Sequence, residues 1–231
     1  MALRSEPRLV ALAGVLAAEV FLIAACNVVT ELAPDVVRGS GNRVSEERDV
    51  EDFTALDVGW GMRTAVTVGP ATSVVIEADD NLVSLIDTTA VDGALIVRPT
   101  EANMQLLSSG GILLKLSAPS LTAVTLSGGA RADVAGINAE SFSVSGSGGS
   151  RATLTGGADR LGVELSGGSR LLAAELASAS AAVEASGGSQ AEVAATVSLS
   201  VDLSGGSRVC YFGAPSVTAD ASGGSTVEPC R

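Results

Sequence analysis

Six near-identical tetrapeptides recur at almost constant spacing through the second half of this 231-residue chain. One is SGGA and five are SGGS, and their first serines are Ser127, Ser147, Ser166, Ser186, Ser204 and Ser222. A weaker copy begins at Ser109. A short and nearly fixed period is typical of proteins in which one small structural unit is stacked on the next. The repeat therefore predicts a stacked architecture for this part of the chain.

The residues on either side of each tetrapeptide alternate between apolar and polar side chains. Apolar residues such as Val163 and Leu165 stand three positions and one position before the first serine, with a polar residue between them. A second apolar pair follows the turn, as at Ala132 and Val134. Such alternation predicts β-strands with one buried face. The two glycines permit the sharp turn between the strands.

Two other interpretations of the repeat fit the sequence less well. A flexible Gly/Ser linker has no reason to alternate Val and Leu with polar residues, and the leucine pattern of leucine-rich repeats is absent. We therefore expect an all-β fold, a parallel β-helix or β-solenoid with about 18–20 residues per coil. At roughly 3.3 Å per residue, a coil of that length accommodates two or three short strands, and the sequence does not choose between them.

The composition limits the size of the side chains in the core and the class of binding partner. Aromatic residues make up only 3% of the chain, which suits a narrow core of Val, Leu and Ala. The net charge of −12 offers no basic surface to phosphates, so we expect no nucleic-acid partner.

The N-terminus resembles an export signal. Arg4 and Arg8 precede an apolar stretch over residues 9–25 that contains Glu19, and Cys26 follows directly. A basic start, an apolar run and small residues at its end indicate a secretory signal. We expect a lipoprotein signal over 1–25, with Cys26 lipidated, and a tether over 26–38. The alternatives are an ordinary signal peptide or an anchoring helix with an incidental cysteine. A lipid on Cys26 would hold the chain on a membrane.

Two further cysteines, Cys210 and Cys230, stand about one coil apart in the chain. In an oxidising compartment we expect a disulfide between them that ties down the C-terminal end of the stack. The alternative is a pair of unpaired, small apolar side chains.

The first half of the mature chain is less regular. Residues 53–58, 64–68, 73–77 and 94–98 are predicted strands, with a helical turn from Asp80 and a tight turn at Asp92–Gly93. We expect residues 39–116 to form the first coils and an irregular N-terminal cap, because a terminal repeat must cover an open edge. Residues 117–231 are expected to form the regular coils.

Several of these segments together resemble one known family. They are GSGN at 39–42, EERDV at 46–50, FTALDV at 53–58, EADDNL at 77–82 and GALIV at 93–97, followed by the serial S-G-[GS] turns. In this order they resemble the head GIN domain family, over about 39–230. The resemblance implies a right-handed β-helix-like fold in bacterial exported proteins, often lipoproteins, described as autotransporter adhesins. It supplies no catalytic residues, so none are carried over.

Charged residues recur at two fixed offsets from the turns. Two positions before the first serine, the last four repeats carry acids: Glu164, Glu184, Asp202 and Asp220. Four positions after it stand Arg131, Arg151, Arg170 and Arg208. Three interpretations remain open. The two columns could pair as a solvated lattice of ions, the acids could bind a divalent cation such as Ca²⁺, or the columns could present a hydrogen-bonding surface to a glycan or a protein.

The residue inventory argues against catalysis. The chain has no His and a single Lys, so neither the turn serines nor Cys210 has an evident activating base. The coils also differ little from one another, whereas an active site needs one exceptional coil. We therefore expect no enzyme and no cofactor, but a structural or adhesin-like binding module at the bacterial cell envelope. The alternative is a polysaccharide lyase or hydrolase on a β-helix scaffold.

Overall fold

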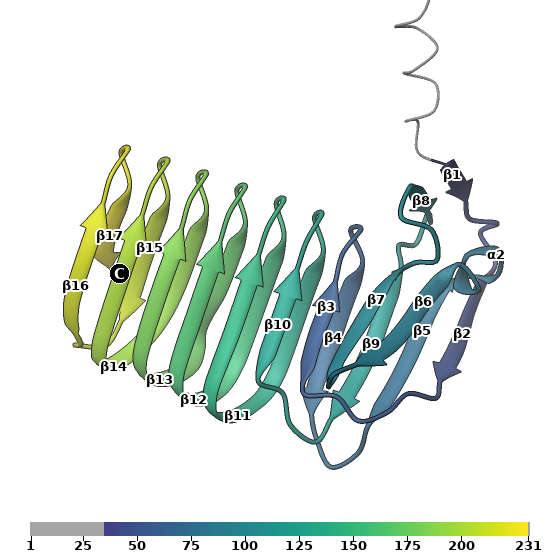
Figure 1. Cartoon of the computed structure of the whole chain (residues 1–231), viewed down its shortest axis with the longest axis horizontal. Coiled ribbons are helices and arrows are strands. Elements are labelled where there is room, and N and C mark those ends of the chain that lie inside the picture. Colours follow the sequence, from purple (N-terminus) through teal and green to yellow (C-terminus); the bar gives the residue numbers. More distant parts are fainter. Residues whose placement is uncertain (1–34, 231) are drawn as a thin grey trace, which may run out of the picture.

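Each regular coil contains two strand segments, joined at one edge by a tight turn and at the other by a bend. The computed structural model describes residues 35–230. In it the regular coils are built from four long strands, β11 (Arg131–Gly146), β12 (Arg151–Leu165), β13 (Arg170–Ala185) and β14 (Gln190–Leu203). Each of them bends across the far edge and therefore contributes to both faces of a flattened β-solenoid (Figure 1). The expected solenoid is confirmed, and the coil contains two strand segments rather than three.

The two faces follow from the strand pairing. The first face takes the C-terminal halves of the long strands together with β3 (Ala55–Val58), β6 (Ile86–Val91), β7 (Ala94–Pro99), β10 (Ala123–Leu126) and β16 (Ser216–Ala221). The second face contains the N-terminal halves of the four long strands. It also contains β2 (Arg43–Arg48), β4 (Arg63–Val68), β5 (Ser73–Asp79), β9 (Leu113–Ala118), β15 (Arg208–Phe212) and β17 (Thr226–Pro229). Pairing between successive regular coils is parallel throughout.

The SGGS turns are closed by both their backbone and their second serine. Both glycines have positive φ in all six copies, 54–67° at the first and 77–82° at the second. L-residues rarely adopt this conformation. In three copies the second serine is buried, and its hydroxyl donates a hydrogen bond to the carbonyl of the first at 2.7–2.8 Å; these serines are Ser169, Ser189 and Ser207. The tetrapeptide is therefore a structural turn, with its two serines in different roles.

The two glycines of a turn have different surroundings. A Cβ atom on the first would lie 2.9–3.1 Å from the backbone nitrogen of the equivalent glycine in the preceding coil, over the five SGGS copies. A Cβ on Gly168, the second glycine of its turn, would meet nothing within 4 Å. Close stacking of the turns thus requires the first glycine, whereas the second is needed only for its backbone conformation.

The core is a continuous row of small and branched side chains between the two faces. Val124, Val144, Val163, Val183 and Val201, three positions before each turn, are all at most 3% exposed. The alternation predicted from the sequence is therefore confirmed in these coils. In the final copy Val217, Ala219 and Ala221 are exposed, because β16 has a neighbouring strand on one side only.

The N-terminal part covers the open end of the stack with mixed pairing. β2 and β5, β5 and β9, and β6 and β7 pair antiparallel, and the single helical turn α2 (Asp80–Val83) follows β5. The helical turn, the Asp92–Gly93 turn and the four predicted strands are present. Strand direction in this region was not predicted, because alternation of apolar and polar residues does not distinguish parallel from antiparallel pairing.

Three details of this region were not predicted. The regular coils stack directly on β3 and β4, because β10 pairs with β3 and β11 with β4, although strands β5 to β9 intervene in the chain. The boundary expected between 116 and 117 falls inside β9. β1 (Asp35–Arg38) lies within the expected tether and pairs in parallel with β8 (Met104–Leu107), in a separate two-stranded sheet.

A disulfide joins the last two strands of the second face, as expected. Cys210 in β15 and Cys230, just after β17, are bonded, with their Cα atoms 5.0 Å apart. The amide of Cys230 also donates to the carbonyl of Tyr211 at 2.9 Å. The expected signal over 1–25 and the lipidation site Cys26 lie outside the described residues. Among the residues described, no helix has the length and apolar character needed to span a membrane.

Candidate functional site: an acidic groove across the coils

The acidic residues predicted from the repeat lie in one straight column on the first face. Glu164 of β12 is the register partner of Glu184 of β13, which is the partner of Asp202 of β14. Asp220 of β16 continues the column. All four are exposed. Because neighbouring strands are about 4.8 Å apart, the carboxylates form a regularly spaced row along the solenoid axis.

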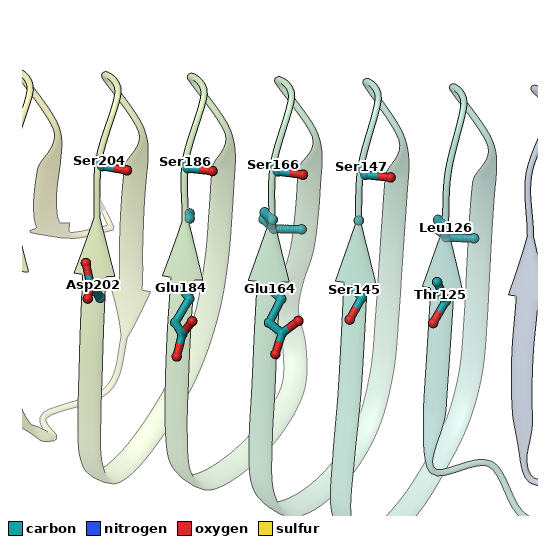
Figure 2. A pocket seen from close by; sticks show the side chains of 13 residues that line it. Thr125, Leu126, Ser145, Ser147, Glu164, Ser166, Glu184, Ser186, Asp202 and Ser204 are labelled. Atoms are coloured by element: carbon teal, nitrogen blue, oxygen red, sulfur yellow. The ribbon is translucent and has the colours of Figure 1, made fainter.

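A groove of about 470 Å³ runs along this column, beside the turns. It crosses the ends of β10 to β14, and Figure 2 shows Glu164, Glu184 and Asp202 pointing from the same side of their strands. A second row, formed by Ser147, Ser166, Ser186 and Ser204, lies closer to the turns. The groove therefore offers a row of hydrogen-bond acceptors beside a row of hydroxyls that can donate or accept.

The groove floor is set by the residue just before each turn. Leu126, Gly146, Leu165 and Ala185 line the groove between the two polar rows. A Cβ on Gly146 would lie 2.9 Å from Leu165 Cδ2 and 3.0 Å from Ser150 Oγ. The glycine therefore lets the leucine of the next coil fill this layer of the core.

The column continues toward the N-terminal cap through two neutral residues and ends at an acid, Asp57, that was not predicted from the sequence. Thr125 and Ser145 occupy it in β10 and β11, and Asp57 of β3 is the register partner of Thr125. Partial burial raises the pKa of the Asp57 carboxyl above its usual value, and the nearby Arg98 guanidinium opposes the shift. Asp57 therefore extends the acidic surface in a less hydrated setting.

The arginines form a second column on the opposite face of the solenoid. Arg131, Arg151 and Arg170 are successive register partners, and Arg208 follows after Gln190. Gln190 accepts a hydrogen bond from Arg170. Arg63 of β4 is the register partner of Arg131 and adds a further guanidinium to the column.

The first of the three interpretations, in which the two columns pair with each other, does not agree with the structure. The ion pairs within residues 35–230 join Arg48 to Glu46, Arg98 to Asp87, Lys115 to Glu77 and Arg160 to Glu140, and none joins the columns. The reason is that the residues before and after each turn belong to different faces, so their outward side chains point away from each other. The acidic column thus has no compensating basic column beside it.

The structure lends no support to the proposed divalent-cation site. Within the described part of the chain, no group of three or more His, Cys, Asp or Glu side chains could hold a metal ion. A column of single carboxylates, each on its own strand, differs from the clustered oxygen ligands that Ca²⁺ takes.

Two of the segments that carry the family resemblance meet in the cap. Ser40 Oγ donates to Asp80 Oδ1 at 2.5 Å, and Asn42 Nδ2 donates to Asp80 Oδ2 at 2.8 Å. These two bonds hold the pKa of Asp80 below its usual value. The amide of Gly41 donates to the buried Asp79 at 3.0 Å. This network joins the segment just before β2 to the end of β5 and the start of α2, so we assign these motif residues to cap structure rather than to the groove.

Asp57 and Arg63 had a signal in the sequence. Gly59–Met62 replaces the turn tetrapeptide, and the Met62 amide donates to the Gly59 carbonyl at 3.2 Å, the bond that closes the regular turns. Relative to Gly59, Asp57 and Arg63 stand at the offsets of the acidic and basic columns. This degenerate copy was hidden because strands β5 to β9 separate it from the first clear repeat.

Comparisons with known proteins agree with this architecture. The family model described as "Putative auto-transporter adhesin, head GIN domain" matches residues 52–215. A crystal structure of a putative adhesin from Bacteroides fragilis NCTC 9343 is similar with a TM-score of 0.69 at 16% identity, over 84% of this chain and 100% of that one. No curated protein sequence matches the chain.

Two structures from Parabacteroides are also similar. One is a putative lipid binding protein from Parabacteroides distasonis ATCC 8503, at 15% identity, and the other is a putative adhesin from Parabacteroides merdae ATCC 43184, at 16%. Each has a TM-score of 0.54 and covers 85% of this chain and 100% of its own. At these identities the structural similarity concerns the fold, whereas the family model spans most of the sequence. The chain belongs to the head GIN domain family.

Proposed function

We propose that this protein is a non-enzymatic, adhesin-like binding module, held outside the cytoplasm at the bacterial cell envelope by a lipid on Cys26. Membership of the head GIN domain family supports the adhesin-like role. The basic start, the apolar run and Cys26 support export and lipidation. A single acyl chain binds a membrane only weakly, so stable anchoring requires more than one chain on that cysteine.

The observation that carries the binding role is the acidic column. Glu164, Glu184 and Asp202 are held in register at one edge of a groove, and within residues 35–230 none of them forms an ion pair. Like charges placed directly opposite each other destabilise a sheet. A bound ligand that supplies hydrogen-bond donors would relieve this repulsion, so the groove suits a ligand rather than the stability of the fold.

The chemistry of the groove defines the class of ligand. Carboxylates only accept hydrogen bonds, so the ligand must present hydroxyl or amine donors. The spacing of the column, one carboxylate per coil, favours a polymer whose donors recur at regular intervals. A surface glycan with free hydroxyls or amines meets both conditions, and the negative net charge disfavours an acidic glycan. An envelope protein with a row of Lys or Arg is the remaining alternative.

A glycan array tests the proposal. The purified protein is compared with the variant Glu164→Gln/Glu184→Gln/Asp202→Asn and with the control Arg131→Gln/Arg151→Gln/Arg170→Gln on the opposite face. We expect the acidic-face variant to lose binding and the control to keep it. Equal binding by all three proteins would exclude the groove. Assaying the bound glycans for new reducing ends or unsaturated sugars tests the non-enzymatic role, because a lyase or hydrolase would release them.

The anchor requires a separate experiment. Mass spectrometry of the protein from its native membrane should show an acylated Cys26 as the first residue, and Cys26→Ser should release the protein from the membrane fraction. A Cys26→Ser protein that stays with the membrane would contradict lipid anchoring without bearing on the groove. Proteolysis of intact cells then tests whether the head is exposed on the surface.

A further inference from the structure

Trp60 stands where every regular turn has its first glycine. A Cβ on Gly128, the first glycine of the next turn, would lie 3.3 Å from the Trp60 backbone nitrogen, so the two positions are stacked. Trp60 has a φ of 55°, close to the 54° of Gly128. A bulky residue with positive φ is a genuine outlier, and such strain is concentrated at functional sites. Glycine would make the same turn without strain, so the fold itself gives no reason for tryptophan here.

The indole is not used to fill the core. Trp60 is 46% exposed, whereas its neighbour Met62 in the same turn is buried. It has room because β8, which leads into the adjacent turn, leaves the first face and pairs with β1 instead (Figure 1). A hollow of about 550 Å³ lies between the turn and β8, lined by Trp60, Asn103, Gln105, Leu107 and Ser127 among others.

Trp60 also lines a smaller, more polar hollow of about 280 Å³. Asp87 and Arg98 line it, with Arg98 Nε 3.8 Å from Asp87 Oδ2, together with Thr100. Both charged side chains are partly exposed. A carboxylate acceptor and a guanidinium donor therefore share a hollow with an exposed indole, which is the pattern of a site with an apolar platform and a few orienting polar groups.

We propose that Trp60 is the platform of a second binding site, which takes one pyranose ring of a neutral glycan. A pyranose has an apolar face of C–H groups that can cover the indole, and a rim of hydroxyls that both donate and accept hydrogen bonds. Asp87 would accept from these hydroxyls, and Arg98 would donate to them. A lipid acyl chain is an alternative ligand for an apolar platform, but it could form no hydrogen bonds with Asp87 and Arg98. This site does not rest on the acidic groove, since none of its proposed contacts belongs to the acidic column.

The single tryptophan of the chain makes the site directly observable. The full protein is titrated with maltohexaose, cellohexaose, mannohexaose and chitohexaose while the intrinsic tryptophan emission is recorded. We expect at least one sugar to give a saturable change in emission. Glu140→Gln should give the same response, because Glu140 is exposed and lines neither the hollow beside Trp60 nor the acidic groove. The absence of a saturable response to all four sugars would overturn the proposal, and so would a response to phosphatidylcholine vesicles alone.

Substitution of Trp60 separates binding from folding. Trp60→Gly restores the glycine of the regular turns, so it should unfold at the same temperature as the parent or higher, while calorimetric binding of the responding sugar falls at least tenfold. Trp60→Tyr should keep part of the affinity, and Asp87→Asn should weaken binding without changing the emission of the free protein. Unchanged sugar binding by Trp60→Gly, or a large loss of its stability, would assign Trp60 a structural role and overturn the proposal.

Discussion

Glu164 and Glu184 lie directly opposite each other on neighbouring strands of the solenoid, with Asp202 next in the same column. The same column holds Thr125 and Ser145 in the two preceding coils, so the fold accepts a neutral residue at this position. The three carboxylates are therefore not required by the architecture. A ligand-binding surface would explain why acids occupy these positions, whereas a contribution to stability would not.

Neutralising the middle carboxylate should stabilise the protein. Glu184→Gln removes repulsion on both sides, so we expect the free energy of unfolding to rise by about 0.2–1 kcal/mol at low ionic strength. The gain should shrink with added salt, because salt screens exposed charges. Glu140→Gln is the matched control, since it removes an exposed ion pair with Arg160 at 2.7 Å and should bring no gain. Chemical unfolding at two salt concentrations measures the difference, and a loss of stability in Glu184→Gln would contradict the repulsion.

The two glycines of one turn should respond differently to alanine. Gly168→Ala meets open space and should cost about 1–2 kcal/mol, the strain of a positive φ alone. Gly167→Ala has the same strain, and its Cβ would also lie 3.0 Å from the Gly148 nitrogen. We therefore expect Gly167→Ala to be clearly the more destabilising of the two in urea unfolding. Equal losses would show that the turns are not closely stacked.

The disulfide should stabilise mainly the C-terminal coil. It closes a separation of 20 residues, for which loop-closure entropy gives about 3 kcal/mol. β17 pairs with β15 alone, so opening of this end need not disturb the inner coils. In Cys210→Ser/Cys230→Ser, amide hydrogen exchange should accelerate in β15 and β17 and stay unchanged in β12. Uniform acceleration along the whole stack would instead indicate that the solenoid unfolds as one unit.

The cap should show a pH-dependent stability that originates at Asp80. Hydrogen bonds from Ser40 and Asn42 lower the pKa of this carboxylate in the folded protein. A lowered folded-state pKa contributes stability above the unfolded-state pKa, and this contribution disappears as the pH falls through the folded-state value. Ser40→Ala should therefore raise the Asp80 pKa, as measured by NMR titration. It should destabilise the protein at pH 7 but not below the folded-state pKa, and an unchanged Asp80 titration would rule out this coupling.

The regular coils could be predicted from the sequence because each repeat carries its own information. Alternation placed Val163 and Leu165 inside and Glu164 outside, and the glycine pair marked the turn. The stacking of the coils on β3 and β4 could not be predicted in the same way. That contact joins strands that are separated in the chain by the whole of β5 to β9, and the turn between β3 and β4 has Trp60 and Met62 in place of the glycine and serine of the repeat.

The candidate site was predicted in part. The offsets from each turn identified the acidic and basic columns, since side chains at one offset recur on one face. The sequence could not show that the two columns lie on opposite faces, because that depends on whether the turn reverses the chain into a second sheet. Trp60 could not be identified as a site residue from the sequence, because its exposure depends on the departure of β8 from the sheet.

The dependence of affinity on ligand length tests the central claim most directly. A groove that crosses the ends of five strands spaced about 4.8 Å apart spans roughly 20 Å. For the glycan that binds on the array, affinity measured by calorimetry should rise with the number of sugar units until the oligomer spans the groove, and then remain constant. Neutralising Glu164, Glu184 and Asp202 together should abolish this rise. Equal affinity for a monosaccharide and a long oligomer, or a length dependence that survives the triple substitution, would contradict the acidic groove as the binding surface.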